Sequence, residues 1–352
     1  MLALGDGRTA TLTETMGAGE HSTVYRGWTE DAYRLKRRVA LKVFNRAPVD
    51  GDALAKLARA VRHAALILHP NVAHTYAMGV GEDGIPFIVQ ELVTGCSLTR
   101  LAAAYARSKR RFPIDLALFI GVDVAEALLG ARRVPTPDGT VLGITHHDLS
   151  PRQVLLSWEG EVKVTDFGLR AALPAGSGLR DMQRLVRRAS YLAPEVLQGE
   201  RGDAKSDVFS LGIMLLELLR GPRFPEGATD VEVLGYAKQG YVHIRVTDPI
   251  LPEDIASVIA RAVQIDPRDR YPHAGVFAYD LRRAAMAMGV GDGRAFLRQA
   301  LADMSEILFV ADEPGASAVD TQREQMAEAL LEQSGELPAI PPSKSGPWLK
   351  GQ

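Results

Sequence analysis

The stretch ITHHDLSPRQVLLSWEGEVKVTDFG, Ile144–Gly168, places two aspartates in loops beside short apolar strands. Asp148 and Asp166 are eighteen positions apart (166 − 148). Two carboxylates so arranged can divide the work of phosphoryl transfer, because one can accept a hydroxyl proton while the other holds a magnesium ion that bridges phosphates. A single loop aspartate is more often a turn or cap residue, so the interpretation depends on the other motifs of the chain.

The composition is that of a globular protein, since 46% of the 352 residues are hydrophobic and 24% are charged. The 41 basic and 43 acidic side chains nearly balance, so no overall field favours nucleic acid or an anionic membrane as a partner. The one cysteine, Cys96, cannot form an internal disulfide, which suits a reducing compartment. The most apolar stretch, VFSLGIMLLELL at residues 208–219, is shorter than the ~20 residues of a membrane span. We therefore expect a cytoplasmic protein without a membrane span.

The order of predicted elements indicates two lobes. Three segments in the first ninety residues, STVYRGW, RRVALKVF and IPFIVQELV, are dense in β-branched or aromatic residues and predict strands. One helix is predicted between them, over residues 52–68, with Asp52 as its N-cap and with His69 and Pro70 ending it. From Leu98 onward apolar residues recur at helical spacing. The pattern predicts an α+β protein with a strand-rich small lobe and a helical large lobe.

A glycine-rich stretch precedes a strand lysine. MGAGEHSTVYRG, Met16–Gly27, contains Gly17 and Gly19, which have no Cβ and let backbone N–H groups approach phosphate oxygens. Alone this motif is more often an ordinary hairpin turn. The strand ending in VALK places Lys42 twenty-five positions after Gly17 (42 − 17), where it could pair with the phosphates of a nucleotide under the glycines.

YLAPE (Tyr191–Glu195) and SDVFSLG (Ser206–Gly212) complete a series of motifs whose order and spacing match one family throughout. The chain resembles the eukaryotic-like (Hanks-type) serine/threonine protein kinases of bacteria, from about Thr11 to about Met288. The resemblance implies the bilobal protein-kinase fold. The N-lobe would span about residues 11–93 and the C-lobe about residues 94–288.

The resemblance also implies binding of ATP and Mg²⁺. Gln90 matches the gatekeeper position beside the adenine, and Asp207 would brace the catalytic loop. Glu195 would pair with Arg270. The residues that would bind the nucleotide are Gly17, Gly19 and Val24 above it, Ala40 and Leu155 on either side of the adenine, Lys42 at the phosphates, and Glu91 and Val93 through their backbone.

The catalytic loop departs from the family pattern HRDLKPxN. His146 and Asp148 match, but His147 replaces the arginine that in many relatives pairs with a phosphorylated activation loop. Ser150 replaces the usual lysine. Arg152 could compensate, because tyrosine kinases carry a phosphate-contacting arginine at the same offset of four from the catalytic aspartate. A surface charge is the alternative for Arg152.

Gln153 replaces the asparagine that holds the second magnesium in the family. Glutamine offers the same amide oxygen on a chain one methylene longer. It could bind the metal only if the loop or the ion shifts by about an ångström, a displacement that can cost catalysis ~100-fold.

The small lobe lacks the acid that normally pairs with the strand lysine. In the family a glutamate on the following helix takes this role, and its place here falls at or near Ala60. No Asp or Glu occurs between Asp52 and Glu82. Lys42 therefore needs another partner or is held by nucleotide alone. A pair with Asp166 is one possibility, and it would compete with magnesium.

These observations leave two main hypotheses. The first is a serine/threonine kinase of reduced activity that acts on protein substrates, and the second is a pseudokinase whose nucleotide pocket stabilises a surface for a signalling partner. A small-molecule phosphotransferase is a third interpretation, which YLAPE disfavours because it belongs to peptide-binding activation segments. The sequence indicates no oligomeric state. For the kinase, the expected catalytic residues are Asp148, Lys42 and Arg152, and the expected metal ligands are Asp166 and Gln153.

The flanking regions are predicted from composition. We expect an N-terminal extension at 1–10, a helical acidic extension at 289–335 and a disordered Pro-rich tail at 336–352. From Asp303 onward the chain has nine acidic and three basic residues, so the extension could dock on the basic activation segment. The arginines of that segment, which could also select acidic substrates, are Arg170, Arg180, Arg184, Arg187 and Arg188.

Overall fold

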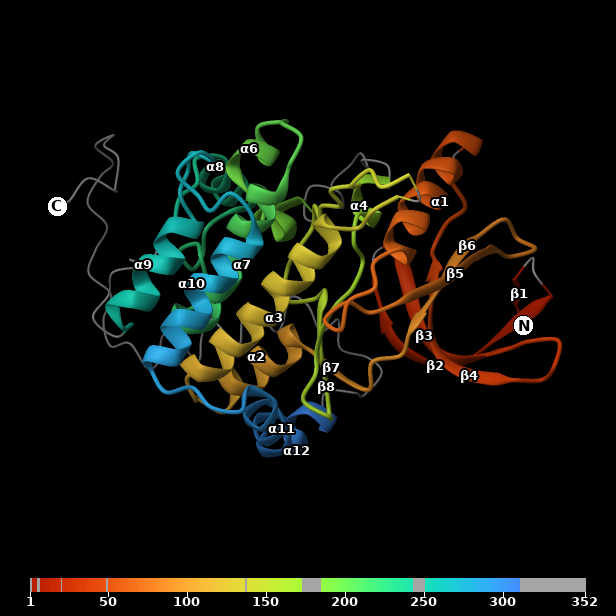
Figure 1. The fold of residues 1–352 in the computed structure, drawn as a ribbon, viewed down its shortest axis with the longest axis horizontal. Coiled ribbons are helices and arrows are strands. Elements are labelled where there is room, and N and C mark those ends of the chain that lie inside the picture. Colours follow the sequence, from red (N-terminus) through yellow and green to blue (C-terminus); the bar gives the residue numbers. More distant parts are fainter. Residues whose placement is uncertain are drawn as a thin grey trace.

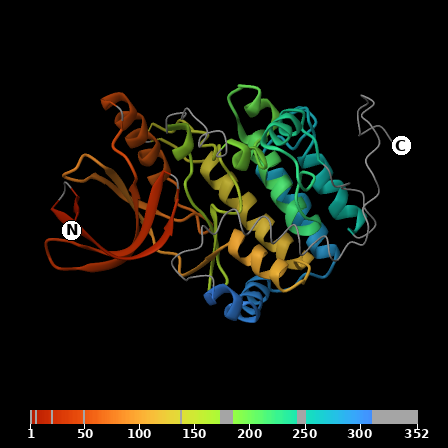
Figure 2. The same ribbon diagram turned by 180° about the vertical axis from the view of Figure 1, so that it is seen from behind.

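The computed structural model describes residues 2–4, 7–19, 21–48, 50–136, 138–172, 185–242 and 251–310. A sheet forms one end of the molecule and a group of helices forms the other (Figures 1 and 2). This is the bilobal kinase fold that the order of motifs predicts.

The N-lobe is a six-stranded antiparallel sheet of order β1-β2-β3-β4-β6-β5. Its strands are β1 (Leu2–Leu4), β2 (Arg8–Ala18), β3 (Ser22–Glu30), β4 (Lys36–Phe44), β5 (Thr75–Val80) and β6 (Pro86–Glu91). Strand β1 pairs with the start of β2, so residues before Thr11 contribute an edge strand to this sheet.

Alternation along β4 decides which side chains face the C-lobe. Val39 and Leu41 are fully buried in a cluster with Phe87 on one face of the sheet. Because successive side chains of a strand point to opposite faces, Ala40 and Lys42 lie on the other face. The apolar alternation of VALK thus aims the lysine away from the core of the sheet.

Helix α1 (Gly51–Ala65) packs on the sheet through Leu57 and Val61. The prediction of Asp52 as its N-cap was wrong, because the carboxylate of Asp50 accepts the hydrogen bond from the backbone N–H of Ala53. Asp52 instead lies in the first turn, where a negative charge also favours the helix N-terminus. The helix ends at Ala65, three residues before the predicted end.

The C-lobe is built around α3 (Ile114–Arg132), which packs against α7 (Ala204–Arg220) and α10 (Ala274–Ala287). The stretch VFSLGIMLLELL lies within α7 and is largely buried, as predicted for a core helix. The other helices are α2 (Leu98–Arg107), α4 (Leu169–Ala172), α6 (Pro194–Leu197), α8 (Asp230–Lys238) and α9 (Glu253–Ala262). A small sheet of β7 (Gly95–Ser97), β8 (Val154–Ser157) and β9 (Val162–Val164) lies beside them.

Two further helices, α11 (Gly293–Asp303) and α12 (Ser305–Val310), follow the kinase-like region. They contact α3 and α2 and bury Leu297, Leu301 and Met304 in the same core (Figure 1). The start of the predicted helical extension at 289–335 thus contains two helices. Its remainder and the Pro-rich tail lie outside the described residues, so docking of the extension on the activation segment stays a hypothesis about residues beyond 310.

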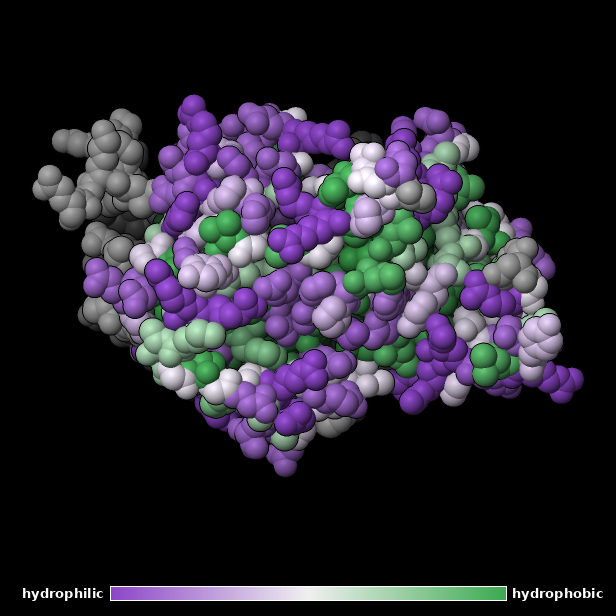
Figure 3. Space-filling model, in the orientation of Figure 1, coloured by the Kyte–Doolittle hydropathy of each residue, from purple (hydrophilic) through white to green (hydrophobic). Residues whose placement is uncertain are grey.

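The surface of the view in Figure 3 is mostly hydrophilic, with hydrophobic residues gathered near the junction of the lobes. Within the described part of the chain, every helix is too short or too polar to cross a bilayer.

A buried ion pair ties α6 to the loop before α10. The carboxylate of Glu195 accepts hydrogen bonds from both Nη groups of Arg270 at 2.7 and 2.8 Å, and Ser206 Oγ donates to it at 2.7 Å. Burial raises the pKa of the Glu195 carboxyl, but the bonds and charge of Arg270 outweigh this and hold the pKa below its ordinary value. The pair expected from the sequence is therefore present and ionised at neutral pH.

We predict that Arg270→Ala lowers the free energy of unfolding by about 3–5 kcal/mol, because it leaves the Glu195 carboxylate buried without its cation. The matched control is Arg282→Ala, which breaks a half-exposed pair with Glu126 and should cost less than about 1 kcal/mol. Urea denaturation measures both. Equal losses in the two variants would contradict the structural role of the buried pair.

Candidate active site

Lys42 of β4 and Asp166 of the loop after β9 meet between the two lobes. The Nζ of Lys42 lies 2.6 Å from Oδ2 of Asp166, and both side chains are mostly buried. The missing helix acid left this pair as one possibility for Lys42, and the structure contains it. A magnesium ion would therefore have to compete with Lys42 for Oδ2 of Asp166.

The second oxygen of Asp166 is free for another ligand. Oδ1 is buried and accepts no hydrogen bond in the described part of the chain. Asp166 also has a left-handed backbone, with a φ of 68°, which costs energy in a residue with a Cβ. A buried carboxylate oxygen without a donor fits a bound cation, since hard divalent ions prefer such oxygens. Asp166 thus suits a magnesium ion shared with nucleotide phosphates.

The expected position of the helix acid is filled by apolar contacts. Ala60 of α1 packs against a cluster that includes Ile88 and Leu169. Leu169 begins α4, which directly follows Asp166–Gly168 and lies against α1. The neighbours of Ala60 on this side of α1 are therefore apolar, and one of them comes from the short helix after Gly168.

The glycine motif is a hairpin above this pair. Gly17 pairs with Val24 in the β2–β3 ladder, and Val24 pairs in turn with Lys42 on β4. At Gly19, whose N–H donates to the Ser22 carbonyl at 2.8 Å, a Cβ would lie only 3.0 Å from that same oxygen. The hairpin and nucleotide-site interpretations are compatible, because the hairpin lies directly beside Lys42.

The predicted adenine site lies at the connection between the lobes. Ala40 of β4 is paired with the buried Gln90 of β6, while Leu155 is a half-buried residue of β8. Val93 lies just after β6, and its N–H and C=O have no hydrogen-bond partner among the described residues. Free backbone groups at this point could bind the edge of a purine.

Glu91 has a further role that the sequence does not predict. Its carboxylate forms an ion pair with Lys163 of β9 at 2.7 Å and accepts the backbone N–H of His74 at 3.1 Å. Its own N–H donates to the His74 carbonyl at 2.7 Å. Glu91 therefore fixes the connection between the lobes to the strand that leads to Asp166.

The buried carboxylate of Asp207 shapes the catalytic loop, as expected from the sequence. Its two oxygens accept the backbone N–H groups of His146 at 2.8 Å and His147 at 3.1 Å. Burial raises the pKa of Asp207 to about 7, although these two bonds favour the ionised form. His147 has a left-handed φ of 67°. Burial first, and then the nearby Arg201, lower the pKa of His147, so its ring does not replace the charge of the arginine found in relatives.

The cation that reaches Asp148 comes from the activation segment. Nε of Arg188 donates to Oδ1 of Asp148 at 2.6 Å. The sequence identified Arg188 only as one member of a basic segment. Arg152, which we expected on the phosphates, is exposed on the catalytic loop.

Gln153, the second expected metal ligand, is held by its own loop. Its Oε1 accepts a hydrogen bond from Ser150 Oγ at 2.5 Å. Its backbone carbonyl accepts the N–H of Thr165, which places Gln153 next to the Asp166 loop. To bind magnesium, the amide oxygen would have to leave or share the serine hydroxyl. Among the described residues there is no cluster of three or more His, Cys, Asp or Glu side chains that could hold a metal without phosphates.

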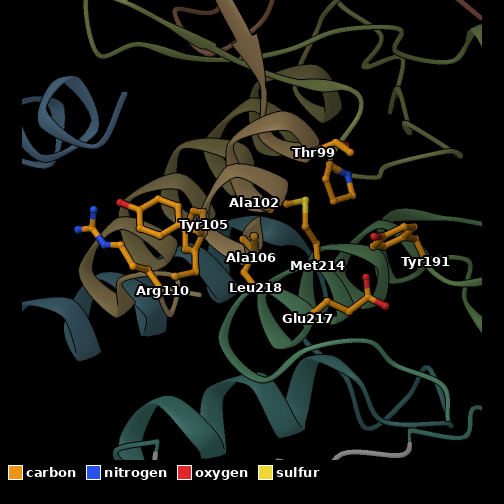
Figure 4. Close-up of a pocket in the computed structure, with 11 residues that line it drawn as sticks. Thr99, Ala102, Tyr105, Ala106, Arg110, Tyr191, Met214, Glu217 and Leu218 are labelled. Atoms are coloured by element: carbon orange, nitrogen blue, oxygen red, sulfur yellow. The ribbon is translucent and has the colours of Figure 1, made fainter. Parts of the chain in front are cut away.

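A pocket of about 80 Å³ lies between α2 and α7, next to the catalytic loop (Figure 4). Pro151 of the catalytic loop and Tyr191 of YLAPE border it. Glu217 of α7 supplies a carboxylate on its rim, and Arg110 lies at its far end (Figure 4). This pocket is separate from the predicted nucleotide site.

A sequence profile described as protein tyrosine and serine/threonine kinase matches residues 10–277. The chain belongs to this protein kinase family. Solved structures agree with the fold: the kinase domain of Mycobacterium tuberculosis PknI superimposes with a TM-score of 0.59 at 22% identity, covering 81% of this chain and 99% of that one.

Characterised relatives of this kinase domain are longer proteins from bacteria. Over 342 residues, 96% of this chain and 49% of the relative, it is 28% identical to the serine/threonine-protein kinase PrkC of Bacillus subtilis. It is 31% identical to the serine/threonine-protein kinase PknB of Mycobacterium leprae, over 71% of this chain and 39% of that protein. It is 32% identical to the tyrosine-protein kinase MasK of Myxococcus xanthus, over 62% of this chain and 33% of that protein. The chain thus spans at most about half of these relatives.

We predict that ATP binds with Lys42 on its phosphates and that Lys42→Met weakens the affinity at least ~10-fold, about 1.4 kcal/mol, because a charge-assisted contact is lost. Isothermal titration calorimetry with and without magnesium measures this. The control is Lys56→Met, which removes an exposed lysine of α1. Equal ATP affinity in the wild type and Lys42→Met would contradict the assignment of this site, and no binding by either would favour an empty scaffold.

Proposed function

We propose that the chain transfers the γ-phosphate of ATP to serine or threonine hydroxyls of proteins. The hydroxyl oxygen of the substrate forms a bond to the γ-phosphorus, while the bond from that phosphorus to the bridging β,γ-oxygen breaks and ADP leaves. Asp148 accepts the hydroxyl proton. Lys42 would orient the phosphates, and Asp166 would hold a magnesium ion, which would neutralise their charge.

The observation that carries this proposal is the state of the Asp166 carboxylate. One oxygen bonds to Lys42 at 2.6 Å, and the other is buried without a hydrogen-bond donor among the described residues. Burying a carboxylate oxygen unsatisfied destabilises a fold, and a bound cation would remove that cost. A module that only binds a partner has no need of a buried carboxylate oxygen without a donor.

The pocket beside the catalytic loop supports a protein as the substrate. It lies between Pro151, three residues after Asp148 (151 − 148), and Tyr191 of the activation segment. A side chain of an extended peptide could enter it while the peptide's hydroxyl approaches Asp148. Two of the relatives named above are serine/threonine kinases and one is a tyrosine kinase, so phosphoamino-acid analysis of the product must decide the acceptor.

A pseudokinase is the second candidate, and two contacts favour it. Lys42 pairs with Asp166 in place of a helix acid, and Oε1 of Gln153 is occupied by the Ser150 hydroxyl. Each contact occupies one oxygen of an expected metal ligand. In this function the nucleotide pocket would stabilise a surface for a signalling partner.

A radiolabelled-phosphate assay on a generic protein substrate and on the protein itself separates these candidates. We predict that Asp148→Asn abolishes transfer, because the base is lost. Gln153→Asn should raise the rate about 10-fold, about 1.4 kcal/mol in the barrier, because a shorter amide releases Ser150 and reaches the metal.

The control for the aspartate substitution is Asp138→Asn, in an exposed turn away from the cleft. It should retain the wild-type rate. If the wild type and all three variants give the same background signal while ATP binding is confirmed, the enzyme proposal fails and the nucleotide-binding scaffold stands. Transfer to small metabolites but never to protein would instead support a small-molecule phosphotransferase.

A further inference from the structure

The catalytic loop lacks a cation at the position where most of its family has one. Ser150 occupies the position of the family's lysine, two residues after the catalytic aspartate. Its hydroxyl is uncharged and donates a hydrogen bond to Gln153. Phosphoryl transfer needs positive charge near the oxygens of the transferred group. Some other residue must supply it if the proposed function is correct.

Arg188 has the required position. Its Nε donates to Oδ1 of Asp148 at 2.6 Å, and Asp148 is its one side-chain partner among the described residues. A guanidinium carries five N–H donors in a planar fork. The bond to Asp148 uses one of them, which leaves the Nη groups for another ligand. About a quarter of the side chain, 26%, is exposed, so a ligand in the cleft can reach it.

The backbone that carries Arg188 is anchored rather than loose. The carbonyl of Arg188 accepts the N–H groups of Tyr191 at 3.0 Å and Leu192 at 3.1 Å. The carbonyls of Ala189 and Ser190, directly after Arg188, accept from Nη1 of Arg223 at 3.2 and 3.0 Å. Arg223 is itself fully buried.

Burying a guanidinium is costly unless it is hydrogen-bonded. Nε of Arg223 donates to the Tyr241 carbonyl at 3.0 Å, and the carbonyls of Ala189 and Ser190 supply further acceptors that offset part of this cost. The buried cation therefore holds the segment that presents Arg188. A catalytic group needs this kind of support, because small displacements of a positioned group strongly reduce rates.

We propose that Arg188, supplied by the activation segment, is a catalytic residue that replaces the missing lysine of the catalytic loop. It binds the terminal phosphate through its Nη groups while Nε holds the Asp148 carboxylate in place. Bidentate recognition of phosphate is the characteristic use of arginine. This proposal deepens the proposed function and rests on it.

The competing interpretation is that Arg188 blocks Asp148 and keeps the chain inactive. The two interpretations predict opposite effects of removing the guanidinium. A phosphate-binding arginine lowers the rate when it is lost, whereas a blocking arginine raises it.

The experiment uses Arg188→Met, which keeps an apolar stem, and the double variant Arg188→Met with Ser150→Lys, which returns a cation to the catalytic loop. Arg268→Met, at a highly exposed arginine, is the control. The first readout is kcat at saturating ATP and protein substrate. The second is the ratio of the Kd of ADP to the Kd of a non-hydrolysable ATP analogue, measured by calorimetry with magnesium.

We expect Arg188→Met to lower kcat about 100-fold, as the loss of one charge-stabilising donor does elsewhere, and to lower the preference for the triphosphate several-fold. The double variant should regain at least tenfold in kcat, which also excludes misfolding as the cause of the loss. A higher kcat in Arg188→Met, or no change in both readouts, would overturn the proposal.

The affinity ratio separates failure of this proposal from failure of the proposed function. If the wild type binds ATP but transfers no phosphate, the enzyme proposal fails. Arg188 is then judged by the affinity ratio alone. A ratio that falls in Arg188→Met still assigns the terminal phosphate to Arg188, and an unchanged ratio rejects it.

Discussion

The ion pair between Lys42 and Asp166 is the contact on which the arrangement of the cleft depends. It joins β4 of the N-lobe to the loop after β9 of the C-lobe at 2.6 Å. In related kinases the lysine is shared with an acid on the following helix, but α1 offers Ala60 and apolar neighbours there. Lys42 and Asp166, the proposed metal ligand, therefore pair through Oδ2, and a nucleotide that binds Lys42 must compete with that pair.

The other side of the cleft is held by buried charges in the C-lobe. Asp207 fixes the left-handed turn at His147 through two backbone N–H groups, and this turn positions Asp148. The guanidiniums of Arg223 and Arg270 are fully buried and fix the YLAPE segment from two directions. These contacts account for a rigid catalytic loop and a rigid end of the activation segment, although the catalytic loop itself departs from the family pattern.

The sequence predicted the parts of the site that follow from local pattern. The alternation of VALK places Lys42 on one face of a strand. The absence of any acid between residues 52 and 82 left a pair with Asp166 as one possibility, which the structure contains. The N-cap of α1 was predicted two residues late, since Asp50 and Asp52 both flank Gly51 and only the backbone geometry distinguishes them.

Contacts between distant segments could not be predicted in the same way. Arg188 and Asp148 are forty residues apart (188 − 148), and their contact depends on how the activation segment folds back on the loop. The pair of Glu91 and Lys163 is likewise set by the packing of the two sheets. The bond between Ser150 and Gln153 is a local contact. A turn brings residues three apart together, so the spacing of these two polar residues in the sequence was a signal for it.

The most direct test of this account is a crystal structure with a non-hydrolysable ATP analogue and Mn²⁺, whose anomalous scattering marks the metal. The account predicts an ion bound to Asp166 Oδ1, with Lys42 Nζ within hydrogen-bond distance of a phosphate oxygen. A nucleotide bound without metal at Asp166, with Lys42 still bonded only to that carboxylate, would contradict it.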